Sequence, residues 1–172
     1  MPALTCPALV AALLLTLAGA QKALDPTMTV GALRALRLPS SPLIVRIGSA
    51  VEMALGIAAI TLGGAALWWA VAVSYAAFGA FVVAALGKGT MIGSCGCFGR
   101  EETPPHSIHV VLDAGLAAVT ALTAVRSPGS SLDALAEEPG SAVAVVVLSA
   151  VALYLLYAAF VELPRALAAA GS

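Results

Sequence analysis

The chain has 172 residues, of which 61% are hydrophobic and only 10% are charged, and its mean hydropathy is +1.03. Soluble domains carry roughly 25% charged residues, so this composition excludes an ordinary soluble protein and indicates a protein of the lipid bilayer. The net charge of −1 also excludes a nucleic-acid-binding protein, because no basic surface is available to neutralise phosphates.

Five apolar segments approach or reach the length that crosses a bilayer. A hydrocarbon core of about 30 Å needs about 20 apolar residues in a helix, whose backbone polar groups are satisfied internally. The segments cover residues 8–20, 43–62, 65–86, 106–125 and 142–161. We therefore predict an all-α, polytopic transmembrane bundle, with four core helices and a fifth appended to them.

The first segment is the shortest and has a second interpretation. It ends in Ala18-Gly19-Ala20, which resembles a signal-peptidase site, but no Lys or Arg precedes it as in a signal peptide. We expect a retained helix that can lengthen by using residues 4–7.

The connecting segments suggest how the chain is divided. In residues 27–41, leucine and valine alternate with arginine, which predicts a short helix at the membrane interface. The pair Gly63-Gly64 predicts a tight turn between the second and third spans. The predicted parts are a four-helix membrane domain over 1–126, a polar linker over 127–140 that forms a mobile loop, and a fifth helix with a short tail over 141–172.

The segment between the third and fourth spans contains two closely spaced cysteines. Cys95 and Cys97 are separated only by Gly96. A disulfide at this spacing would close a very small ring, and departures from relaxed geometry make such a bond easier to reduce. The pair therefore indicates thiol–disulfide exchange through a mixed disulfide, and Cys97, nearer the next helix, is expected to form the thiolate more readily. The alternative is a tight structural turn.

Three polar residues begin the fourth span. His106, His109 and Asp113 are three and four residues apart, so they share one face of a helix. The N-terminal end of this helix and a protonated imidazole would both favour the thiolate form of the cysteines. The same cysteines and histidines could instead bind zinc, but zinc-binding cysteines usually have two or more residues between them. We expect no metal here, and packing remains the alternative role of each histidine.

Glu52 lies well inside the second span, where an ionisable side chain costs roughly several kcal/mol unless it faces a partner or water. Arg46 lies on another face of the same helix. The expected partner is therefore Lys22 or Asp113 from a neighbouring helix, and the alternative is a carboxylate that reaches the lipid headgroups.

The aromatic residues Trp68, Trp69 and Tyr75 predict packing and interface anchoring, with quinone binding as the less favoured alternative. Cys6 is expected to pack as a small apolar residue.

Three stretches of the sequence suggest a family. They are Cys-Gly-Cys-Phe-Gly at 95–99, Ala-Gly-x-x-Lys-x-x-Asp at 18–25, and Val51-Glu52 followed by Gly56. In this order they resemble the MauE family, which is named for methylamine utilisation and is grouped with the DoxX-like four-helix membrane proteins. The resemblance covers about residues 8–125.

This resemblance implies a membrane partner of a thioredoxin-like protein, acting in disulfide formation or thiol electron transfer outside the cytoplasm. Maturation of methylamine dehydrogenase is the task implied by the family name. Cys95 and Cys97 would be the redox pair, and Lys22 and Glu52 would be family-typical polar positions. No thioredoxin domain is recognisable in the sequence, so we expect a separate partner. A non-catalytic assembly factor and a zinc-bound structural protein remain alternatives.

The basic residues give conflicting information about orientation. All but Arg126 are expected on the side of the cysteines, which the positive-inside rule places in the cytoplasm. These residues are Lys22, Arg34, Arg37, Arg46, Lys88, Arg100 and Arg165. Cytoplasmic thiols normally stay reduced, whereas the resemblance implies an extracytoplasmic thiol role. We favour the outer placement, in a plasma-membrane protein.

Overall fold

The computed structural model describes residues 2–87, 106–126, 130–137 and 139–170. Within these ranges the regular elements are all helices, and five of them, α1, α3, α4, α5 and α7, are long and apolar enough to cross a membrane. The helices are α1 (Pro2–Leu24), α2 (Thr27–Ala35), α3 (Pro42–Thr61), α4 (Ala65–Gly87), α5 (Ser107–Arg126), α6 (Ser131–Glu137) and α7 (Pro139–Ala170). The predicted all-α polytopic bundle is confirmed.

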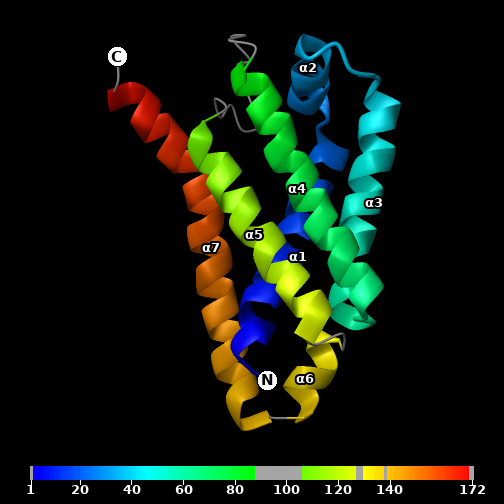
Figure 1. Ribbon diagram of the computed structural model, residues 1–172, viewed down its shortest axis with the longest axis vertical. Helices are drawn as coiled ribbons and strands as arrows, with labels where there is room; N and C mark the ends of the chain where they lie inside the picture. The colour runs from blue at the N-terminus through cyan, green and yellow to red at the C-terminus, as the bar shows by residue number, and fades with distance from the viewer. Residues whose placement is uncertain (1, 88–105, 127–129, 138, 171–172) are drawn as a thin grey trace.

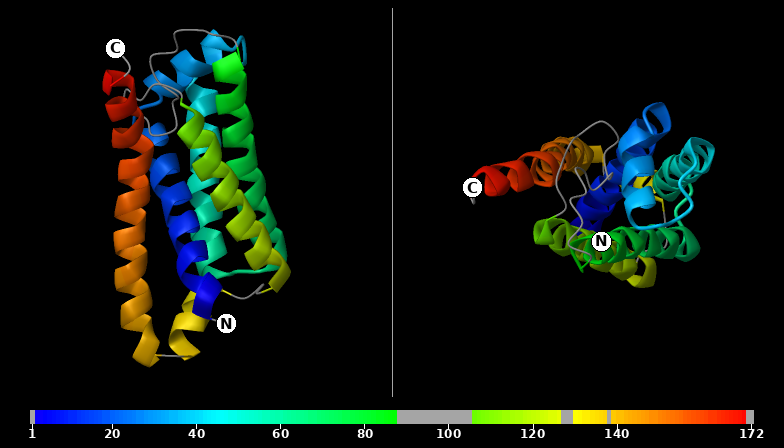
Figure 2. Two further views of the ribbon diagram at one scale, coloured as in Figure 1. Left: turned by 60° about the vertical axis from the view of Figure 1, so that its left-hand side comes forward. Right: turned by 90° about the horizontal axis from the view of Figure 1, so that it is seen from above.

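The five long helices run along the long axis of the molecule, with α2 at one end and α6 at the other (Figures 1 and 2). Helix α1 contacts α3, α5 and α7, so it lies in the interior of the bundle. Helices α1 and α3 form one closely packed pair, and α4 and α5 form another. The N-terminal helix is therefore the element around which the others are arranged.

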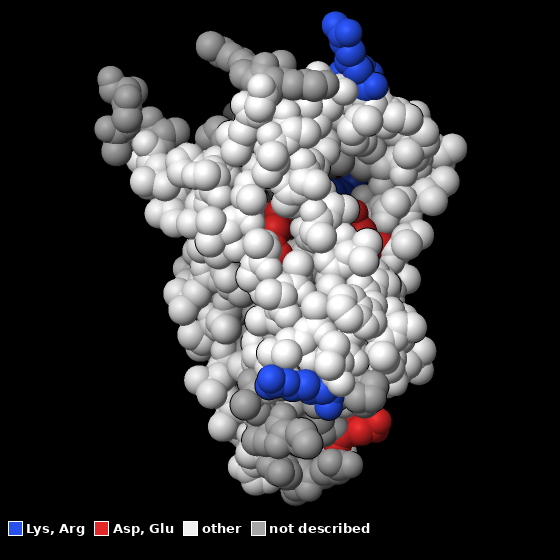
Figure 3. Space-filling model, viewed as in Figure 1, with Lys and Arg blue, Asp and Glu red and all other residues white. Residues whose placement is uncertain are grey.

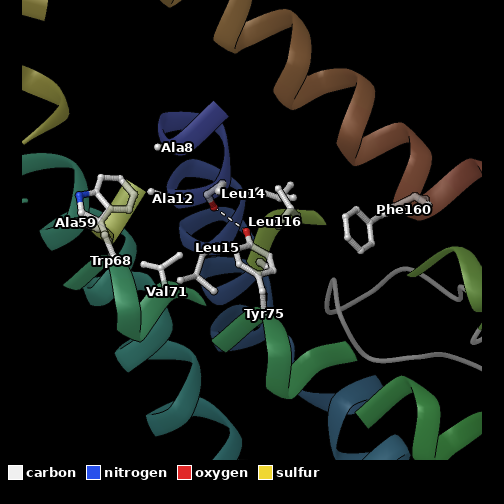
Figure 4. Packing of buried hydrophobic residues seen from close by; sticks show 14 residues of the cluster. Ala8, Ala12, Leu14, Leu15, Ala59, Trp68, Val71, Tyr75, Leu116 and Phe160 are labelled. Atoms are coloured by element: carbon white, nitrogen blue, oxygen red, sulfur yellow. Dashed lines mark hydrogen bonds between the residues drawn. The ribbon is translucent and has the colours of Figure 1, made fainter. Parts of the chain in front are cut away.

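Helix α1 is longer at both ends than the predicted segment, and it supplies much of the apolar core. Leu14 and Leu15 are each 1% exposed, and they pack with Trp68 and Tyr75 of α4 (Figure 4). The Tyr75 hydroxyl donates a hydrogen bond of 2.7 Å to the backbone carbonyl of Ala11. This integration into the core supports a retained helix, because removing α1 would expose the surfaces that it covers.

Two glycines allow α1 and α3 to approach closely. A Cβ atom added to Gly56 would lie 2.6 Å from the carbonyl oxygen of Ala12, and one added to Gly19 would lie 2.7 Å from the carbonyl oxygen of Ser49. Small residues at a crossing let two backbones pack without intervening side chains. This contact brings the charged residues of the two helices within reach of each other.

The short connecting elements agree with the sequence in part. The predicted short helix is present as α2; Ala32 and the following Leu36 pack against Ala85 of α4, and Arg34 is exposed. The predicted turn between α3 and α4 is also present. Gly63 and Gly64 adopt φ values of 66° and 95°, which glycine adopts without steric cost.

The prediction of a loop throughout the polar linker is wrong for residues 131–137, which form α6. The Ser130 hydroxyl accepts a hydrogen bond of 2.9 Å from the Asp133 backbone N–H, as an N-cap does. The predicted fifth span agrees with the observed apolar span, Gly140–Leu163, but the helix that carries it is longer, because α7 continues through Pro164 to Ala170. Transmembrane helices tolerate proline where neighbouring groups satisfy the backbone that it disrupts.

Candidate functional site

Five of the seven predicted site residues lie in the described part of the chain: Lys22, Glu52, His106, His109 and Asp113. Cys95 and Cys97 lie outside the described residues. The C-terminal end of α4 and the N-terminal end of α5, which flank the cysteine segment, lie at the same end of the bundle as α2 (Figure 1). The candidate site is therefore described from the helices that border this segment.

Lys22 and Glu52 form an ion pair between α1 and α3. The Lys22 side chain is 6% exposed and that of Glu52 is 21% exposed. The Lys22 ammonium also lies 4.6 Å from the centre of the Phe78 ring, in cation–π geometry. The prediction of Lys22 as the partner of Glu52 is confirmed.

A cavity of about 270 Å³ lies beside this ion pair, between α1, α2, α3 and α4. Its walls are mainly apolar, and Lys22 and Glu52 provide charged groups within it. The face of the molecule seen in Figure 3 carries few charges along its middle, where the visible acidic and basic atoms are recessed. The ion pair thus borders a cavity that is partly open to the outside.

Asp113 is 2% exposed and lies on the other side of Lys22 from this cavity. Both residues line a second cavity of about 20 Å³, together with Tyr75 and Phe160. A space of this size can hold a single water molecule. One buried ammonium therefore lies near two carboxylates, and Glu52 is the one that pairs with it directly.

His109 connects α5 to α7. Its Nε2 lies 3.0 Å from the backbone carbonyl oxygen of Phe160, and its Nδ1 lies 3.2 Å from the backbone nitrogen of His106. With its proton on Nε2, the ring donates to the Phe160 carbonyl and accepts from the His106 N–H, and its Nδ1 also lies 3.2 Å from the His106 carbonyl oxygen. The full burial of His109 and these contacts support the packing alternative for this residue.

The Phe160 carbonyl, which contacts His109, lacks the usual backbone donor within α7. In an α-helix, the carbonyl of residue 160 accepts from the N–H of residue 164, and proline at 164 has no N–H. The His109 imidazole therefore supplies a donor that α7 cannot supply. This interaction explains how α7 continues as a helix through Pro164.

His106 lies immediately before α5 and is half-buried. Its Nδ1 accepts a hydrogen bond of 3.2 Å from the Ile108 backbone N–H. The first N–H groups of a helix have no carbonyl partner within the helix, so this ring acts as a cap. His106 thus fixes the point at which the chain enters α5 after the cysteine segment.

The sequence did not identify the aromatic residues of the large cavity. These are Phe78 and Phe81, which are three residues apart and share one face of α4. Their spacing is the signal in the sequence that could have identified them, whereas the candidate aromatic residues from the sequence were Trp68, Trp69 and Tyr75. None of those three lines the large cavity, and Trp68 and Tyr75 are buried in the core as the packing prediction requires.

Comparison with known proteins identifies the family. The chain matches the family model of Methylamine utilisation protein MauE over residues 1–126, which comprise α1 to α5. No curated protein and no solved structure matches the chain. The match covers well over half of the sequence, and the five apolar helices make this a multi-pass membrane protein. The chain belongs to the MauE family of methylamine utilisation proteins.

Proposed function

We propose that this protein performs thiol–disulfide exchange through Cys95 and Cys97, at the outer side of the plasma membrane, with a thioredoxin-like protein as its partner. The observation that carries the proposal is the Cys-Gly-Cys pair in the segment that joins α4 to α5 of a MauE-family chain. The family name suggests maturation of methylamine dehydrogenase as the task of this exchange.

The helices around the cysteine segment support this role. The C-terminal end of α4 is covered by α2, through Ala32, Leu36 and Ala85, and the start of α5 is capped by His106. The segment is therefore joined to the bundle at two well-packed points. Precise attachment favours a catalytic pair, because an exchanging thiol must meet its partner in a defined geometry.

The exchange conserves electrons and protons. In the oxidising direction, a thiolate of the partner attacks the Cys95–Cys97 disulfide, and one of the two cysteines leaves as a thiolate. The second thiol of the partner then attacks the mixed disulfide. The partner leaves with a new disulfide, while Cys95 and Cys97 are both reduced and need a second acceptor to be oxidised again.

The ion pair lowers by one the count of basic residues that opposes the outer placement. Lys22 is buried and paired with Glu52, so it does not act as a topological charge at the membrane surface. Among the side chains that the structure describes, Arg34, Arg37 and Arg46 are exposed at the α2 end, and Arg126 is exposed at the other end. The bias towards a cytoplasmic cysteine segment is thus weaker than the sequence count indicated.

Serine variants test the proposal. Cys95→Ser, Cys97→Ser and the double variant are produced in cells in which the disulfide state of an extracytoplasmic thioredoxin-like protein can be followed. Thiol exchange predicts loss of partner oxidation at a normal level of the membrane protein. An assembly factor without catalytic activity would work without the cysteines, and a zinc-bound structural protein would lose its fold on chelation.

A further inference from the structure

The large cavity beside the Lys22–Glu52 pair has no part in the thiol exchange itself. It is lined by residues of four helices, α2 among them, and is partly open. Its volume of about 270 Å³ exceeds the roughly 150 Å³ that accommodates benzene in an apolar protein cavity. A substituted ring is therefore within its capacity.

The walls of the cavity suit a flat apolar ring that arrives from the bilayer. Phe78 and Phe81 contribute aromatic rings from α4, and Ile44 and Val45 contribute aliphatic side chains from α3. Ile44 is 51% exposed and its neighbour Ile47 is 58% exposed. Ile44 also lines the cavity, so an exposed apolar surface of α3 borders it, and a long apolar tail can extend along that surface.

Lys22 and Glu52 restrict the kind of polar head group that a ligand in this cavity can carry. Lys22 and Glu52 together carry no net charge, so an anionic head meets the carboxylate and a cationic head meets the ammonium. A neutral head with oxygen atoms fits both, since a carbonyl oxygen accepts from the ammonium and a hydroxyl donates to the carboxylate. A quinone presents the carbonyl in its oxidised form and the hydroxyl in its reduced form.

We propose that this cavity binds the ring of a lipid-soluble quinone, with Lys22 and Glu52 at its oxygen atoms and its isoprenoid tail in the bilayer. The quinone is then the second acceptor of the proposed thiol exchange, on which this part of the proposal rests. Two S–H bonds break and one S–S bond forms, while the two electrons and two protons convert the quinone to a quinol. Phe81 precedes the end of α4 at Gly87 by about 9 Å along the helix axis.

Glycine substitutions can fill the cavity without disturbing the ion pair. A Cβ atom added to Gly48, which lines the cavity, would meet no atom within 4 Å, so Gly48→Leu extends into open space. Gly115 on α5 has the same free surroundings but does not line the cavity, which makes Gly115→Leu the matched control. Ala77→Leu fills the cavity from α4 and provides a second, independent variant.

The test measures the binding of decylubiquinone to the full-length protein in lipid nanodiscs. We expect both cavity-filling variants to lower the affinity by about tenfold or more, and Gly115→Leu to retain the wild-type affinity. Thermal unfolding of each variant shows whether it is folded. Equal binding by the wild-type protein and two folded cavity-filling variants would overturn the proposal, as would a bound phospholipid that decylubiquinone fails to displace.

The Cys97→Ser variant separates this proposal from the proposed function. It should bind decylubiquinone as the wild-type protein does, but should form no quinol when it is reduced beforehand. Binding without quinol formation by the reduced wild-type protein would preserve the site and contradict its role as electron acceptor. Absence of saturable binding, together with a trapped mixed disulfide, would contradict the site and leave the thiol exchange in place.

Discussion

The ion pair between Lys22 and Glu52 predicts strong energetic coupling between α1 and α3. Removing one member of a buried pair strands the other charge, which costs about 3–5 kcal/mol in proteins. Lys22→Met leaves the Glu52 side chain, which is 21% exposed and adjoins the cavity, so we expect the lower end of that range. Glu52→Leu leaves Lys22, whose side chain is only 6% exposed, so we expect the upper end.

The double variant should be much more stable than the sum of the two losses implies. It leaves no stranded charge, and replacing a buried pair with apolar residues is often close to neutral. The cation–π contact with Phe78 is lost in any variant without Lys22, and it contributes about 0.5–2 kcal/mol. The two single losses together reach about 8 kcal/mol, so we expect a coupling free energy of about 6 kcal/mol between the two positions.

The assay is reversible unfolding in mixed detergent micelles, followed by circular dichroism and fluorescence, for the wild-type protein, both single variants and the double variant. Arg34→Met is the control, because this side chain is exposed on α2 and its loss should change stability by no more than about 0.5 kcal/mol. Single-variant losses that add in the double variant to within about 0.5 kcal/mol would refute the coupling.

Three further variants test packing with the same unfolding assay. Gly56→Ala should lower the free energy of unfolding by about 1–3 kcal/mol, because its methyl group meets the α1 backbone. Gly115→Ala should cause no loss, and equal effects of the two variants would contradict the close crossing of α1 and α3. Tyr75→Phe should cost about 1–3 kcal/mol, since it removes the donor to a buried α1 carbonyl, and an unchanged stability would count against that bond. His109→Phe should lower the free energy of unfolding by about 1–3 kcal/mol. Adding Pro164→Ala to that variant should recover part of the loss, because it restores a backbone N–H. An absence of recovery would argue against the assigned role of His109.

The fold was largely accessible from the sequence because the bilayer fixes the length of a spanning helix. The long apolar segments and the Gly63-Gly64 turn therefore predicted the spans and one connection correctly. Two differences between the structure and the prediction have local causes. Ser130 lies in a polar segment with several other serines, so its role as the N-cap of α6 did not stand out in the sequence. The continuation of α7 through Pro164 depends on a hydrogen-bond donor from His109, which is distant in the sequence.

The candidate site was accessible only in part. An ionisable residue inside a span needs a partner, and that rule led correctly from Glu52 to Lys22. The cavity beside them could not be predicted, because it depends on how four helices pack. The cysteine pair remains a prediction from the sequence, since residues 88–105 lie outside the described part of the chain.

The central claim is that Cys95 and Cys97 exchange disulfides, and trapping of thiols in intact cells tests it most directly. Cells are treated first with a membrane-impermeant and then with a permeant thiol reagent, beside cells that carry Cys97→Ser. Thiol exchange at the outer side predicts a partly oxidised pair, access by the impermeant reagent, and a mixed disulfide between the variant and a thioredoxin-like protein. If both thiols stay reduced, form no mixed disulfide and remain protected until a chelator is added, the pair binds metal and the proposed mechanism is wrong.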